Sequence, residues 1–119
     1  MRALLKKLLS TTTPVLAAGL FLLGASAFAP SVLAQGDPVA GAAVFKANCN
    51  ACHLGGKNMV NPQKNLSREA LEKYGKFSYD AIVKQVTNGA GAMPSYKRLG
   101  DEKIANVAAY VLQQASRGW

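Results

Sequence analysis

The feature that most constrains this chain is a run of five residues, Cys49-Asn50-Ala51-Cys52-His53, which holds both cysteines and the only histidine of the sequence. A disulfide between the two cysteines would close so short a loop that it would restrict the unfolded chain very little. A thioredoxin-like thiol pair requires a strand and helix context that is absent, and a structural zinc site requires four ligands. A thiol or zinc module, which would be colourless, is therefore the least favoured interpretation.

The spacing of this run is instead that of the attachment motif for c-type haem. Two thiols three residues apart can form thioethers with the two vinyl groups on one edge of a porphyrin, while the adjacent imidazole binds the iron. A bound haem would also supplement the core, since a domain this small buries only about 60% of its unfolded surface. We therefore predict one haem c, attached covalently through Cys49 and Cys52, with His53 as an axial iron ligand.

The second axial ligand is predicted to be a methionine, because the chain has no second histidine. Met1 lies in the predicted leader, and Met59 is so near His53 that the chain could pass round the ring only if almost fully extended. Met93 has ample chain and is followed by Pro94, which fixes the backbone. Iron held by His53 and Met93 has no open position, which favours electron transfer. A haem enzyme or gas sensor, which needs an open or labile sixth position, is the alternative.

Residues 1–34 are predicted to be a cleaved signal peptide. Three basic residues near the start are followed by an uncharged apolar run over residues 15–29, which is shorter than the roughly 20 residues that span a bilayer. We place the cut after Ala34, with cuts after Ala27 or Ala29 as weaker alternatives, and a permanent membrane anchor is disfavoured. The mature chain is then one exported domain of residues 35–119.

The charge of the mature chain indicates what kind of partner it binds. Three of the 14 Lys and Arg residues lie in the leader, which leaves 11 basic residues against 6 acidic ones and a formal charge of +5. Such a surface prefers an acidic partner. The basic residues are scattered and not interleaved with aromatic residues, so nucleic acid is not the expected target.

The apolar residues of the mature chain recur with a helical period, which predicts an all-α fold of four short helices wrapped around the haem. The predicted helices begin after the N-cap residues Asp37, Ser67 and Ser78, and the longest covers residues 101–116. Loops rich in glycine, asparagine and proline are predicted over residues 54–65 and 89–100. Gly41 could allow a bulky residue such as Tyr110 to cross closely, although a lone helical glycine is more often merely tolerated.

With these residues in place, the mature chain resembles the cytochrome c6 family, photosynthetic carriers of cyanobacteria and algae. The resemblance covers nearly all of residues 35–119, through GAAVF (41–45), NCNACHLGG (48–56), ALEKYG (70–75), AIVKQVTNG (81–89), AMP (92–94) and VAAYVLQQASRGW (107–119). It implies the class I cytochrome c fold, haem attachment at Cys49 and Cys52, and His53 and Met93 as axial ligands. It further implies electron transfer from the cytochrome b6f complex to photosystem I, in the thylakoid lumen or periplasm.

The resemblance also implies roles for residues outside the motif. Gln85 is expected to face the haem and shift its potential, and Lys97 and Arg98 are expected near the exposed haem edge, where an acidic partner docks. Lys57 is expected to be a solvated loop charge. The family commonly has Gly-Gly after the aromatic residue that follows Met-Pro, whereas Tyr96 is followed directly by Lys97. The alternative role is that of a class I cytochrome that serves a respiratory terminal oxidase.

Overall fold

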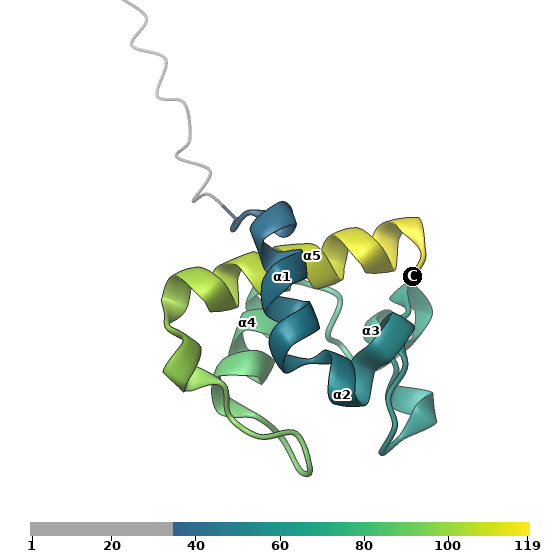
Figure 1. Cartoon of the computed structure of the whole chain (residues 1–119). Coiled ribbons are helices and arrows are strands. Elements are labelled where there is room, and N and C mark those ends of the chain that lie inside the picture. The colour runs from purple at the N-terminus through teal and green to yellow at the C-terminus, as the bar shows by residue number, and fades with distance from the viewer. Residues whose placement is uncertain (1–34) are drawn as a thin grey trace, which may run out of the picture. The chain divides into compact units, whose positions relative to one another are not determined.

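The computed structural model describes residues 35–119, so the predicted leader and its cleavage position lie outside the described residues. Within residues 35–119 the chain forms α-helices and short 3₁₀ turns and no strand, apart from an isolated antiparallel bridge between Ala90 and Met93 (Figure 1). The all-α prediction is confirmed. None of the helices in this range is sufficiently long and apolar to cross a bilayer.

The α-helices are α1 (Pro38–Asn48), α2 (Asn50–His53), α3 (Arg68–Lys73), α4 (Tyr79–Asn88) and α5 (Asp101–Arg117). The 3₁₀ turns are η1 (Leu54–Gly56), η2 (Pro62–Lys64) and η3 (Lys97–Leu99). Four of the α-helices are the predicted ones. The fifth, α2, is a single turn that holds the cysteine and histidine motif, and the turns η1, η2 and η3 lie within the two predicted loops.

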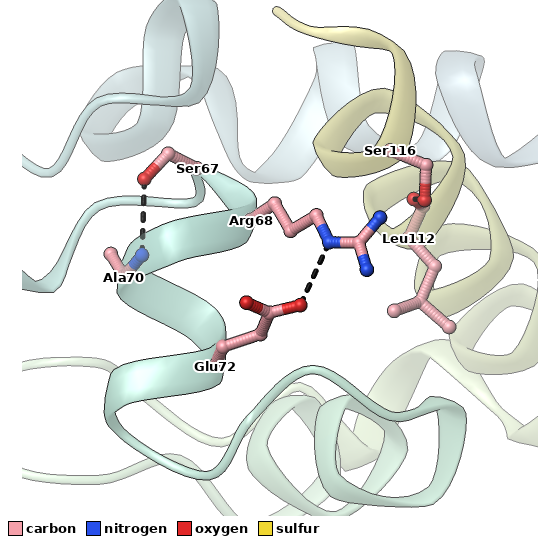
Figure 2. Close-up of polar contacts among 6 residues, drawn as sticks. All are labelled: Ser67, Arg68, Ala70, Glu72, Leu112 and Ser116. Carbon is pink, nitrogen blue, oxygen red and sulfur yellow. Dashed lines mark hydrogen bonds and ion pairs between the residues drawn. The ribbon is translucent and has the colours of Figure 1, made fainter.

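The predicted N-caps are confirmed, because each capping side chain accepts a hydrogen bond from the first turn of its helix. The Asp37 carboxylate accepts from the Val39 N–H at 2.8 Å, and Pro38 occupies the first position of α1. The Ser67 hydroxyl accepts from the Ala70 N–H at 3.2 Å (Figure 2). Ser78 caps α4 in the same way, again at 3.2 Å. Local sequence thus decides where these three helices begin.

Helices α1 and α5 pack against each other at a crossing that requires glycine. A Cβ at Gly41 would lie only 2.0 Å from the carbonyl oxygen of Asn106 and 2.8 Å from the Cβ of Tyr110. The close crossing suggested by the sequence is therefore present. Its nearest contact is the Asn106 backbone, which cannot move aside, so Gly41 is required rather than merely tolerated.

The core lies where α1, α3, α4 and α5 meet. Its side chains are at most 6% exposed: Phe45, Leu71, Ile82, Val86, Ile104, Val107, Ala108, Val111 and Ala115. An aromatic group packs beside it, with the ring centroids of Phe45 and Trp119 5.2 Å apart and those of Tyr110 and Trp119 6.0 Å apart. In the view of Figure 1, α2 and the loops before α3 and α5 project on the side away from α5. Of the motif, Cys49 packs against this core.

Candidate haem-binding site

The cysteine and histidine motif is held by the end of α1 and the single turn of α2. The Cys49 N–H donates to the Phe45 carbonyl at 2.8 Å, which ties the motif to the last turn of α1. The His53 N–H in turn donates to the Cys49 carbonyl at 2.9 Å. Residues three and four apart on a helical turn face the same side, so Cys49 shares a side with Cys52 and His53.

The imidazole of His53 is oriented by a backbone carbonyl. Its Nδ1 lies 2.8 Å from the carbonyl oxygen of Lys57. A carbonyl oxygen can only accept a hydrogen bond, so Nδ1 carries a proton, and in the neutral imidazole Nε2 then keeps its lone pair. A metal-binding histidine commonly has this arrangement, in which the hydrogen bond fixes the tautomer and the ring direction. The Nε2 of His53 is therefore free to bind iron.

The two thiols differ in exposure and neither forms a disulfide. Cys52 is exposed, whereas Cys49 is partly buried, and burial raises the pKa of the Cys49 thiol to about 11. A thiol with so high a pKa stays protonated near neutral pH and is a poor thiolate nucleophile. No group of three or more His, Cys, Asp or Glu side chains within residues 35–119 could hold a metal ion. The protonated state of Cys49 argues against a reactive thiol pair.

Met93 lies in a tight loop that is fixed against the end of α4. Ala90 and Met93 exchange two backbone hydrogen bonds, both of 3.0 Å. A Cβ at Gly89, whose φ is +69°, would lie 2.5 Å from the Met93 carbonyl oxygen, so this approach requires glycine. The amide Nε2 of Gln85 on α4 donates to the Met93 sulfur at 3.7 Å. A thioether sulfur has two lone pairs, so the second remains available for iron.

The other methionine considered as a ligand has a different environment. Met59 is 69% exposed, and its N–H donates to the Cys52 carbonyl at 3.0 Å. Met93, by contrast, is partly buried and packs against the same core cluster as Cys49. The structure thus brings Gln85 and Met93 together, a contact that the sequence did not predict.

Tyr96 joins the Met93 loop to the motif, a contact that the sequence did not predict. Its hydroxyl donates to the carbonyl of Asn48 at 3.0 Å, directly before Cys49, and its N–H donates to the Val86 carbonyl at 2.9 Å. A tyrosine three residues after Met93 was a visible feature. Its partner is a backbone atom 48 residues away, which no local pattern identifies.

The basic residues that were assigned to docking follow this loop on η3. Lys97 and Arg98 are both exposed. The guanidinium of Arg98 lies 4.9 Å from the centroid of the Tyr96 ring, a cation–π distance. Lys57 is also exposed, as expected, and its backbone carbonyl is the acceptor for His53. Lys57 thus takes part in the site through its backbone carbonyl and not through its charged side chain.

Three comparisons with known proteins bear on this arrangement. Residues 36–111 match a sequence family described as cytochrome c oxidase, cbb3-type, subunit III. Cytochrome c6 of Aphanizomenon flos-aquae is 61% identical over 84 residues, which is 70% of this chain and 97% of that protein. Cytochrome c6 of Gloeothece citriformis is 51% identical over 116 residues, 97% of this chain and all of that protein. The chain belongs to the cytochrome c6 family. The crystal structure of cytochrome c6 from the diatom Phaeodactylum tricornutum agrees, with a TM-score of 0.69, 53% identity, and coverage of 71% of this chain and 100% of that one.

Membership of the cytochrome c6 family settles the class of function and the cofactor. Proteins of this family are electron carriers rather than enzymes, and they hold haem c covalently. The predicted fold, function class and cofactor are thereby confirmed. The side chains of this chain fit that group, since it presents two free thiols, an imidazole with a free Nε2 and a thioether sulfur.

Proposed function

We propose that this protein carries single electrons from the cytochrome b6f complex to photosystem I, on a haem held by Cys49, Cys52, His53 and Met93. Membership of the cytochrome c6 family supports the role of carrier. The observation that supports the haem site is the His53 hydrogen bond to Lys57, which leaves Nε2 as the one ring nitrogen of the only histidine that is free to bind iron. The bound haem supplies the one-electron change. His53 and Met93 contribute neutral ligands on fixed backbone, so the site needs little rearrangement when its charge changes.

The proposed attachment is through thioethers at Cys49 and Cys52. The helical turn between them puts both thiols on one side of the chain. Neither thiol forms a disulfide within the described residues, so both are free to react with the haem vinyl groups. Replacing either cysteine by serine should weaken or abolish covalent attachment, and replacing His53 should abolish a stable holoprotein.

The proposed site of action is the thylakoid lumen or periplasm, reached after removal of residues 1–34. The described structure offers one observation on the mature chain, because its second residue, Gly36, already packs against α5. The backbone of Gly36 lies so close to α5 that a Cβ there would be 2.3 Å from the carbonyl carbon of Ala105. N-terminal sequencing of the exported protein, expected to begin at Gln35, tests this assignment.

The proposed docking surface is formed by Lys97 and Arg98, beside the loop that holds Met93. Both side chains are exposed, and the Arg98 guanidinium is held over Tyr96 next to that loop. Positive charge at this position would attract an acidic partner and raise its association rate. This attraction weakens as salt shortens the Debye length to about 10 Å at 0.1 M.

Flash-induced oxidation kinetics with isolated photosystem I test the proposal. Arg98→Glu should slow electron transfer about tenfold at low salt, and much less at high salt, with an unchanged spectrum and potential. Arg117→Glu, the same charge change in the last turn of α5, is the matched control and should have a smaller effect. Equal rates for Arg98→Glu and the control at low ionic strength would show that this basic surface is not where photosystem I docks.

Electron delivery to a respiratory terminal oxidase is the second candidate function. The matching sequence family favours this candidate, because its description names a subunit of an oxidase. The chemistry of the site would be unchanged, and only the acceptor would differ. Comparing the rates at which the reduced protein transfers electrons to photosystem I and to a terminal oxidase separates the two roles.

A further inference from the structure

Trp119 contacts three separate parts of the described chain. Its ring packs on Phe45 of α1, with centroids 5.2 Å apart, and on Tyr110 of α5, with centroids 6.0 Å apart. Its indole Nε1 donates a 2.7 Å hydrogen bond to the carbonyl of Leu66, at the end of the loop that follows the motif. Trp119 thus connects this loop to the α1–α5 core.

The start of the same loop also lies against the indole. A Cβ on Gly56 would be 2.3 Å from Cγ of Trp119, and the φ of Gly56 is +74°, so only glycine fits there without displacement. Gly56 and Leu66 are themselves joined, because the Leu66 N–H donates to the Gly56 carbonyl at 2.7 Å. Trp119 therefore holds the place where the two ends of the loop meet.

The loop has internal structure but little apolar packing of its own. Asn58 stiffens it by donating from its amide to the Lys64 carbonyl at 2.8 Å. Its apolar side chains, however, make little contact with the rest of the described chain: Leu54, Met59 and Val60 are 65%, 69% and 66% exposed among the protein atoms. A segment with so few buried contacts opens easily unless something anchors it. The contacts of Trp119 with Gly56 and Leu66 provide that anchor.

The anchor lies one residue away from the group that orients His53. Lys57 follows Gly56 directly, and its carbonyl accepts the 2.8 Å hydrogen bond from Nδ1 of His53. We propose that Trp119 is a positioning residue for the proximal histidine, holding the loop so that the Lys57 carbonyl stays in hydrogen-bond contact with the imidazole. This inference rests on the proposed role of His53 as an iron ligand.

The proposal has a defined consequence for the redox site. A hydrogen bond from Nδ1 to a carbonyl makes the imidazole a stronger donor to the metal, which favours the more highly charged ferric state. Loss of the anchor weakens that bond, so the potential should rise and the Nδ1 proton should exchange faster with solvent.

Trp119→Phe in the holoprotein tests the proposal, because it keeps an aromatic ring but removes the donor to Leu66. Exchange of the His53 Nδ1 proton, followed by NMR in the reduced protein, should become about fivefold faster, the equivalent of about 1 kcal/mol for one hydrogen bond. The midpoint potential should rise. Ile104→Val, which removes a buried methyl group from α5 at a position 1% exposed, is the control for a general loss of stability and should change neither quantity.

Gly56→Ala displaces the loop from the opposite side of the contact and should shift both quantities in the same direction, so a failure of Trp119→Phe to fold leaves the test intact. The proposal is overturned if these variants match Ile104→Val in proton exchange and potential. NMR signals of ligated His53 and Met93 in the wild type test the ligand assignment itself. Their absence would refute the proposed function, whereas their presence together with unchanged variants would refute only the role of Trp119.

Discussion

Removing the hydroxyl of Tyr96 should loosen the Met93 loop while leaving the rest of the site in place. The hydroxyl donates to the Asn48 carbonyl at 3.0 Å and is the contact that ties this loop to the end of α1. Tyr96→Phe deletes that bond and keeps the ring, so the cation–π contact with Arg98 and the backbone bond to Val86 both remain. The variant therefore isolates a single interaction.

The size of the effect follows from the net worth of one hydrogen bond, about 1 kcal/mol. At 25 °C this free energy corresponds to a loop that opens about five times as often. Under the proposed ligation, imidazole binds the ferric protein only after Met93 has left the iron, so the rate of imidazole binding should rise about fivefold in Tyr96→Phe. The melting temperature should also fall by about 4–8 °C, as expected for a loss of 1 kcal/mol in a domain of this size.

Stopped-flow imidazole binding, measured together with thermal unfolding, is the assay. Tyr110→Phe is the matched control, because the described residues show no hydrogen bond to the Tyr110 hydroxyl although its ring lies in the aromatic group. It should leave the imidazole rate unchanged. If Tyr96→Phe bound imidazole no faster than Tyr110→Phe, the Tyr96 bond would not restrain Met93 and our reasoning about this loop would be wrong.

Three further substitutions test other parts of the account. Met93→Ala should open the sixth iron position, lower the potential and let carbon monoxide or cyanide bind readily, whereas Met59→Ala should do neither; exchanged phenotypes would show the ligand assignment to be wrong. Gln85→Val should lower the midpoint potential by about 40 mV, the equivalent of about 1 kcal/mol. The reason is that the Gln85 amide N–H points at the Met93 sulfur and disfavours the extra positive charge of ferric iron. An unchanged potential would show that Gln85 does not tune the haem. Gly41→Ala should lower the free energy of unfolding in urea by about 2 kcal/mol despite the better helix propensity of alanine, because its Cβ would collide with the Asn106 backbone. Ala43→Gly, at an exposed position of the same helix, measures the effect of helix propensity alone. A Gly41→Ala protein as stable as the wild type would contradict the close crossing.

Features that depend on neighbouring residues were predictable from the sequence. Asp37, Ser67 and Ser78 bond to N–H groups two or three residues away, so residue type and position identify them as N-caps. The cysteine and histidine spacing is local in the same way, because the side chains proposed to attach haem and to bind its iron on one face lie within five consecutive residues. That spacing is sufficient to indicate haem.

Features that depend on distant backbone atoms were not predictable in this way. The Tyr96 hydroxyl and the Trp119 indole bond to carbonyls 48 and 53 residues away, and every residue has a carbonyl, so the sequence carries no trace of which one is used. The Lys57 carbonyl lies only four residues from His53, yet it also escaped prediction, because the sequence distinguishes Lys57 only by its side-chain charge. At Gly41 the crossing was suggested correctly, but the nearest contact proved to be the backbone of Asn106.

The absorption spectrum of the purified holoprotein, recorded beside that of Met93→Ala, tests the central claim most directly. The account predicts a coloured protein whose haem stays with the chain after acid extraction. It also predicts a ferric methionine-to-iron charge-transfer band near the red edge of the spectrum, which is lost in Met93→Ala. A colourless protein, an extractable haem, or a charge-transfer band that survives in Met93→Ala would contradict the claim that this chain is a covalent haem carrier ligated by His53 and Met93.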